Sequence, residues 1–200
     1  MTPPSLSKTA GLILAGGRSS RFGTDKALAH FQGELMLGRA RRPLQHLPMI
    51  ALSAKAGSTV ARHAEACALL VLYDDPRGPD GPLAGVFEGL RWASALGFSS
   101  LACLPCDAPL LPLDLVSTLM RRQGAAPAAF AQTLHGPHPL CALWDTSVAA
   151  ALGQVLSHGE HPPVRDFLAS IGAAAVWFDD ADAFANANTR AGLTALEQSH

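Results

Sequence analysis

Apolar stretches alternate with segments of helical period from one end of this chain to the other. Short runs of apolar residues predict strands at 11–15, 49–53, 69–73, 100–104, 128–131, 140–144 and 173–178. Between them, segments whose apolar residues recur three and four positions apart predict helices at 35–46, 59–66, 83–96, 113–123, 146–157, 164–171 and 189–198. This regular exchange of strands and helices predicts an α/β fold.

The predicted strands are continuous apolar runs rather than alternations of apolar and polar positions. Such strands are buried on both faces, as in mostly parallel sheets that helices cover on each side. We therefore expect a three-layer α/β/α sandwich with a Rossmann-like, mostly parallel sheet, formed by residues 1–200 as a single domain. Ligands of such sheets bind beyond the carboxyl ends of the strands. The loops after Ala15, Tyr73 and Leu104 are therefore the expected site.

Composition and charge exclude several classes of protein. Of the 200 residues, 48% are hydrophobic and 16% are charged, which is typical of a globular protein and not of a disordered chain. The formal net charge of -1 provides no positive field for a nucleic-acid backbone. The longest apolar runs, such as 66–73, are too short to span a bilayer, and the first residues show no targeting pattern. We expect a cytoplasmic protein that binds neither nucleic acid nor a membrane.

The four cysteines are too few and too scattered for a disulfide framework. Cys103 and Cys106 have the C-x-x-C spacing of redox pairs and of zinc sites. The pair ends an apolar strand, however, and no second C-x-x-C follows, so packing inside the strand is the preferred interpretation. Two H-x-x-H pairs, at 135–138 and 158–161, are interrupted by glycine or proline and are interpreted as loop histidines rather than metal ligands.

A glycine-rich loop follows the first predicted strand in LILAGGRSSRFGTDKAL, residues 12–28. A P-loop has four residues between its glycines and then Lys and Ser/Thr, whereas five residues separate Gly17 from the next glycine here, and alanine follows Lys26. The dinucleotide pattern G-x-G-x-x-G is absent as well, since Gly16 and Gly17 are adjacent. Adjacent glycines let the backbone approach a base and phosphates, and Arg21 and Lys26 supply positive charge. We expect the loop to bind a nucleoside triphosphate.

Two further loops place carboxylates at the ends of predicted strands. Asp74 and Asp75 follow the strand in LVLYDDPRGPDGPLAGV, a stretch that contains three glycines. Asp107 follows another strand in LACLPCDAPLLP, between Pro105 and Pro109, which restrict its backbone. Mg²⁺ prefers oxygen ligands and commonly takes one or two carboxylates with phosphates and waters. Asp107 is therefore a candidate Mg²⁺ ligand, on the same sheet edge as the glycine-rich loop if the strands are parallel.

The stretch LAGGRSSRFGTDK resembles the nucleotidyltransferase signature L-A-G-G-x-S-x-R-M-G-x-D-K, with Phe22 in place of the methionine. With GPLAG, LPCDAPLLP, HPLCAL and NANT, which follow in family order over nearly the whole chain, it resembles the molybdenum cofactor guanylyltransferases. The resemblance implies a three-layer α/β sandwich of the nucleotide-diphospho-sugar transferase type. This fold agrees with the one that the hydrophobic pattern predicts.

The resemblance also assigns roles by position. The residues that it implies for the nucleotide are Leu14, Ala15, Gly16, Gly17, Lys26, Asp74 and Asp107. Lys26, Asp107 and Arg21 are the implied catalytic residues, and Asp107 is the implied Mg²⁺ ligand.

The chain also departs from the family pattern. Ser53 stands where the family usually has an asparagine, and Arg190 replaces the proline of a C-terminal N-x-N-T-P motif. A serine cannot make the paired hydrogen bonds of an amide. The asparagines of this motif, Asn186 and Asn188, are expected on the pterin side, and Arg165 is a further candidate for the pterin phosphate.

The implied reaction transfers GMP from GTP to molybdopterin with release of pyrophosphate. The implied partners are GTP, the molybdopterin cofactor, and the proteins that deliver molybdopterin and accept the product. A cytidylyltransferase or another small nucleotidyltransferase is the alternative within the class, although LAGG rather than LAAG favours GTP. A nucleotide-binding carrier without catalysis is the alternative outside it, but a carrier has no need of a metal carboxylate.

Overall fold

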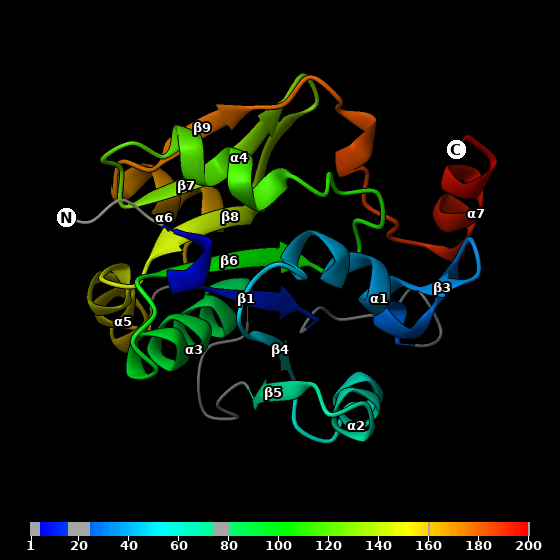
Figure 1. Ribbon diagram of the computed structural model, residues 1–200, viewed down its shortest axis with the longest axis horizontal. Helices are drawn as coiled ribbons and strands as arrows, with labels where there is room; N and C mark the ends of the chain where they lie inside the picture. The colour runs from blue at the N-terminus through cyan, green and yellow to red at the C-terminus, as the bar shows by residue number, and fades with distance from the viewer. Residues whose placement is uncertain (1–4, 16–24, 74–80, 160, 200) are drawn as a thin grey trace.

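The computed structural model describes residues 5–15, 25–73, 81–159 and 161–199. Its main sheet has seven strands in the order β5-β4-β1-β6-β8-β7-β9 (Figure 1). These strands are β1 Thr9–Leu14, β4 Ile50–Ala54, β5 Leu70–Tyr73, β6 Ser100–Pro105, β7 Ala128–Thr133, β8 Gly136–Asp145 and β9 Ala174–Trp177. A small hairpin of β2 His30–Phe31 and β3 Glu34–Leu35 lies apart from this sheet.

Helices connect most of the strands. The α-helices are α1 Met36–Arg41, α2 Thr59–Ala66, α3 Pro82–Ala95, α4 Leu115–Arg122, α5 Val148–Ser157, α6 Val164–Ser170 and α7 Arg190–Ser199. Short 3₁₀ helices are η1 Leu6–Lys8, η2 Lys26–Leu28, η3 Arg42–Leu44 and η4 Asp182–Phe184.

The sheet is mixed but mostly parallel, as the sequence predicted. β1 pairs in parallel with both β4 and β6, so the carboxyl ends of these strands lie together, with Leu14 in register with Ser53 and Pro105. β4 and β5 are also parallel, as are β7 and β9. The long strand β8 is antiparallel to both of its neighbours, β6 and β7. In Figure 1 the arrowheads of β1 and β6 point to the side of the molecule where α7 lies.

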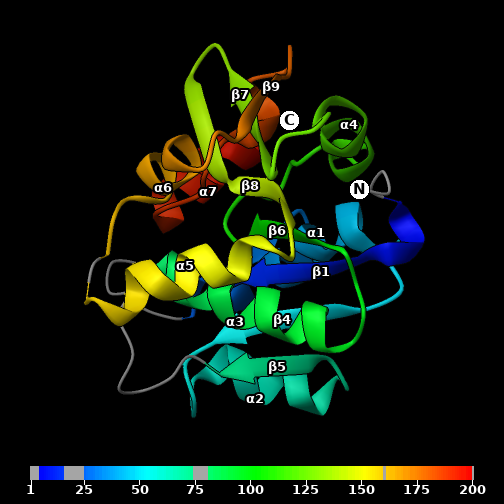
Figure 2. The ribbon, with the colours of Figure 1, turned by 90° about the vertical axis from the view of Figure 1, so that its left-hand side faces the viewer.

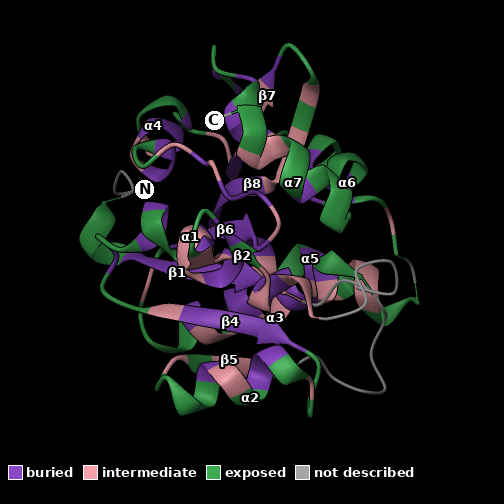
Figure 3. Ribbon diagram, turned by 90° about the vertical axis from the view of Figure 1, so that its right-hand side faces the viewer, coloured by how far each residue is buried: buried purple, intermediate pink, exposed green. Residues whose placement is uncertain are grey.

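Successive side chains of β1 point to opposite faces of the sheet. They are buried in two separate hydrophobic cores, one on each face. Ile13 belongs to the core that α1, α2 and α4 cover, and Leu12 and Leu14 belong to the core that α3, α5 and α6 cover. Figure 2 shows α3 and α5 side by side along the second face, and Figure 3 shows buried strands enclosed by helices with exposed outer surfaces. The three-layer sandwich is confirmed.

Most predicted elements are present, with differences where prolines or very short elements occur. The helix predicted at 35–46 divides into α1 and η3, because Pro43 cannot donate a backbone hydrogen bond and occupies the first turn of η3. The hairpin β2–β3 was not predicted, since strands of two residues carry no recognisable period. β8 begins before the predicted 140–144, because its first residues pair with the end of β7.

The C-x-x-C pair packs within the fold. Cys103 and Cys106 are both free thiols that lie in the cores on opposite faces of the sheet. Burial raises the pKa of the Cys103 thiol, and burial with the nearby Asp107 carboxylate raises the pKa of Cys106 to about 12. The interpretation as strand packing is confirmed, because side chains on opposite faces cannot form a redox pair or share a metal.

Candidate active site

The parallel ends of β1 and β6 bring Lys26 and Asp107 together. The Cys106 N–H donates to the carbonyl oxygen of Leu14 at 3.1 Å, which ties the loop after β6 to the end of β1. Nζ of Lys26 lies 2.7 Å from Oδ2 of Asp107, and the two side chains are 13% and 23% exposed. The sequence placed both residues on this sheet edge, and the structure joins them in an ion pair.

A third loop reaches the same ammonium group. Nζ of Lys26 also donates to Oδ1 of Asn188 at 2.8 Å. The neighbouring Ala187 N–H donates to the carbonyl oxygen of Asp107 at 2.9 Å, and the Ala187 side chain is buried against Phe31 and Leu193. The segment before α7 is therefore fixed against the loop after β6. The sequence identified Asn188 through the N-x-N-T resemblance but gave no signal that it would contact Lys26.

Asp25 holds the end of the glycine-rich loop. Its carboxylate caps η2, with Oδ1 accepting the Ala27 N–H at 3.4 Å, and Oδ2 accepts the Val60 N–H in the first turn of α2 at 3.0 Å. Sequence reasoning assigned Asp25 no role. The available signal was its fixed place in the signature G-x-D-K, directly before Lys26.

The ends of β1 and β4 meet the start of α3 at close range. The Ala15 N–H donates to the carbonyl oxygen of Ser53 at 2.9 Å, and Ser53 is buried. A Cβ atom on Gly85 of α3 would lie 2.4 Å from Oγ of Ser53 and 3.1 Å from Cδ2 of Leu14. Glycine at position 85 therefore lets α3 approach the strand ends where the nucleotide is expected.

Several expected site residues lie outside the described residues. These are Gly16, Gly17, Arg21 and Asp74, and Phe22 lies there as well. Of the nucleotide and catalytic candidates, the structure places Leu14, Ala15, Lys26 and Asp107 at one edge of the sheet.

Other candidates from the sequence have local partners. Nε of Arg165 donates to Oδ1 of Asp166 at 3.1 Å on the exposed surface of α6. His138, interpreted from the sequence as a loop histidine, lies instead in β8, where Nε2 is hydrogen-bonded to Oγ1 of Thr133 at 2.9 Å and the ring packs against Phe184. Desolvation, with a smaller effect of the nearby His135, lowers the pKa of His138.

The oxygen atoms around Lys26 fit the Mg²⁺ ion that the family resemblance implies. A carboxylate oxygen of Asp107 and an amide oxygen of Asn188 converge on one cation, the Lys26 ammonium. Oxygen donors of this kind suit Mg²⁺, which completes its shell with phosphates and waters. Within the described part of the chain, no group of three or more His, Cys, Asp or Glu side chains is arranged to hold a metal. The residues present fit an ion shared with substrate phosphates.

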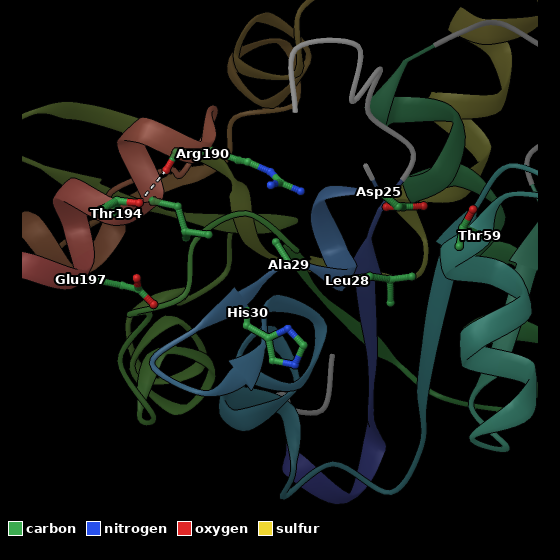
Figure 4. A pocket seen from close by; sticks show the side chains of 9 residues that line it. Asp25, Leu28, Ala29, His30, Thr59, Arg190, Thr194 and Glu197 are labelled. Carbon is green, nitrogen blue, oxygen red and sulfur yellow. Dashed lines mark hydrogen bonds between the residues drawn. The ribbon is translucent and has the colours of Figure 1, made fainter. Parts of the chain in front are cut away.

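A cavity of about 560 Å³ lies beside η2, between α2 and α7. Figure 4 shows the Arg190 side chain extending from α7 across this space, with Asp25 and Thr59 on the other side. Asp25 therefore lines this cavity and also contacts the first turn of α2.

Residues 11–187 match the MobA-like NTP transferase domain. This chain belongs to the MobA-like NTP transferase family. A molybdenum cofactor guanylyltransferase of Acidiphilium cryptum is 43% identical over 201 residues, which span 98% of each chain. The resemblance drawn from the motifs is confirmed, and with it the expected enzyme class, a nucleotidyltransferase.

Solved structures share the fold of this MobA-like NTP transferase. Molybdopterin-guanine dinucleotide biosynthesis protein A from Archaeoglobus fulgidus superposes with a TM-score of 0.74 at 18% identity, over 95% of this chain and 97% of its own. A Mycobacterium tuberculosis protein solved in complex with manganese has a TM-score of 0.69 at 16% identity, over 96% and 99% of the two chains.

Among the described residues, no helix is long and apolar enough to cross a membrane.

Proposed function

We propose that this MobA-like NTP transferase transfers GMP from GTP to the terminal phosphate of Mo-molybdopterin, releasing pyrophosphate and forming molybdopterin guanine dinucleotide. The family makes the chain a nucleotidyltransferase, and a relative that is 43% identical over 98% of both chains is named as a molybdenum cofactor guanylyltransferase. The observation that carries the proposal is the convergence of Lys26, Asp107 and Asn188 at the joined ends of β1 and β6. A nucleotidyltransferase needs cationic and metal-binding groups together at this place.

The proposed nucleotide site follows the strand ends. Leu14 ends β1 and Ala15 follows it, with the Ala15 N–H donating to the carbonyl oxygen of Ser53 at the point where Gly85 lets α3 approach closely. Gly16, Gly17 and Asp74 complete this site in the proposal, on the strength of the motif resemblance alone.

The chemistry needs positioning and charge neutralisation rather than a general base. A phosphate oxygen of molybdopterin forms a bond to the α-phosphorus of GTP, and the bond from that phosphorus to the bridging oxygen of the β-phosphate breaks, with its electron pair leaving on pyrophosphate. A phosphate is already anionic at neutral pH, so orientation and electrostatic stabilisation carry the rate. Lys26 and Arg21 offer positive charge to the phosphates in this scheme.

Asp107, with Asn188 beside it, would hold Mg²⁺. When bound there, the ion neutralises charge on the phosphates and fixes their geometry. Asp107 also orients the Lys26 ammonium directly, through the 2.7 Å ion pair. We place the enzyme in the cytoplasm, with protein partners that deliver molybdopterin and accept the product.

Release of pyrophosphate from each nucleoside triphosphate tests this function. The purified protein is supplied with Mg²⁺, Mo-molybdopterin and one of GTP, CTP, ATP or UTP, and pyrophosphate and dinucleotide are measured together. We expect pyrophosphate release with GTP and with none of the other three nucleotides. This release should also require molybdopterin. Release with CTP would favour a cytidylyltransferase, and nucleotide binding without release would favour a carrier.

A further inference from the structure

We propose that Asp25 is a positioning residue for this transfer, because it fastens η2 to α2 and thereby fixes Lys26 at the reacting phosphates. The inference rests on the proposed function for its catalytic consequence. Asp25 itself touches neither Asp107 nor Asn188 through the hydrogen bonds of the described residues; its two carboxylate oxygens accept backbone N–H groups. It therefore acts through Lys26 and is not a catalytic residue.

The anchor that Asp25 uses is α2, a helix that packs against the core. α2 buries Val60, Ala61 and Ala64, each at most 1% exposed, against the face of the sheet that β4 helps to form. The Val60 N–H belongs to the first turn of this helix, where N–H groups have no partner within the helix. A carboxylate at this end is favoured by the helix dipole as well as by the hydrogen bond.

Between the anchor and the ammonium group, the backbone has little freedom. The Leu28 N–H donates to the carbonyl oxygen of Asp25 at 3.0 Å, and the Ala29 N–H donates to that of Lys26 at 3.1 Å. Ala27, the residue after Lys26, is 1% exposed and packs into the same core as α2. The backbone of Lys26 is therefore held in a hydrogen-bonded turn, and the Lys26 side chain extends from this turn to Asp107.

The chain offers a matched control for a role limited to capping α2. Oγ of Ser58 accepts the Ala61 N–H at 3.3 Å, so Ser58 caps the same helix, and none of its hydrogen bonds to the described residues reaches η2. Loss of either cap weakens the helix. Only loss of the Asp25 carboxylate releases the turn that carries Lys26.

The variants Asp25→Ala, Asp25→Asn and Ser58→Ala test the proposal in the full-length protein. Asparagine retains one acceptor oxygen where aspartate uses two, so Asp25→Asn should have an intermediate effect. We expect kcat/KM for GTP to fall about tenfold or more in Asp25→Ala and less in Asp25→Asn, because small displacements of a positioned group cost large factors in rate. Ser58→Ala should retain the wild-type value.

A second readout follows Lys26 without any turnover. The sequence has only three lysines, Lys8, Lys26 and Lys55, so side-chain ¹⁵N spectra of lysine-labelled protein contain few signals, and Lys26→Met assigns the relevant one. We expect the Lys26 signal to shift, with faster proton exchange, in Asp25→Ala and to stay unchanged in Ser58→Ala. Thermal unfolding of each variant reports any loss of fold.

An unchanged Lys26 signal in a folded Asp25→Ala or Asp25→Asn protein would overturn the proposal. Equal losses of kcat/KM in Asp25→Ala and Ser58→Ala would do so as well, since they would reduce Asp25 to a helix cap. If the wild-type protein transfers no GMP, the proposed function fails, and the spectra still decide whether Asp25 positions Lys26.

Discussion

At the scale of single residues, the centre of the candidate site is one ammonium group that donates to two side-chain oxygens. Lys26 and Asp107 are 81 positions apart in sequence, yet they form a 2.7 Å ion pair, and Asn188 completes it from the far end of the chain. Each of these residues is polar and follows a strand or precedes a helix, so the sequence marks them as candidates. Their mutual distances depend on three loops that meet only in the folded chain.

Replacing Asp107 tests this arrangement most directly. We expect Asp107→Asn to lower kcat/KM by about 100-fold or more, because the charge that would hold Mg²⁺ and orient Lys26 is lost while the shape of the side chain is kept. Mn²⁺ binding, followed by electron paramagnetic resonance, should weaken in parallel, and circular dichroism should stay as in the wild type. Asp114→Asn, at the exposed start of α4, serves as the control. Near-normal turnover in Asp107→Asn would remove Asp107 from the metal site.

At the scale of elements, the close approach of α3 to the sheet depends on missing side chains. A Cβ on Gly89 would lie 2.5 Å from Cδ2 of Leu12 and 3.0 Å from Cδ2 of Leu101, so the helix axis is set by the absence of that atom. The sequence predicted α3 from its apolar period. It could not predict the closeness, because glycine by itself also occurs in helices for other reasons.

We therefore expect Gly89→Ala to destabilise the protein, although helix propensity by itself favours alanine over glycine. Alanine in a helix interior is favoured over glycine by about 1 kcal/mol, whereas overpacking of a core costs about 1–3 kcal/mol. Because the clash involves two buried leucines, we expect the free energy of unfolding to decrease, as measured by urea denaturation. In a Leu12→Ala background the same substitution should cost less, which a double-mutant cycle measures. If Gly89→Ala by itself stabilises the protein, α3 can move away from the sheet without losing packing energy, and the prediction is wrong.

At the scale of the whole molecule, one sheet is shared by two hydrophobic cores. Successive residues of β1 and β6 point into opposite cores, so neither layer of helices can detach without exposing the same strands. We propose on this ground that the chain folds as one domain. All four cysteines are free thiols, and the same arrangement buries three of them.

The accessibility of the thiols tests this arrangement of the fold. Cys67 is exposed, whereas Cys103, Cys106 and Cys141 are buried, and burial raises the pKa of each of these three thiols. Since the thiolate is the reactive form, an aromatic disulfide reagent at pH 8 should titrate one thiol per native chain and four after unfolding. Cys67→Ser should abolish the native reaction. Rapid reaction of any of the three remaining thiols in the folded Cys67→Ser variant would contradict the packing of the cores.

The sequence by itself determined the order of the main strands and helices, the sheet edge where the candidate site lies, and the identity of Lys26 and Asp107 as candidates. It did so because burial imposes a period on each segment and because the signature keeps its spacing along the chain. Only the tertiary structure decided that β8 runs antiparallel, that Asn188 joins Lys26, and that Asp25 fastens η2 to α2. These features are contacts between segments far apart in sequence, and their geometry follows from how the layers pack rather than from any local pattern.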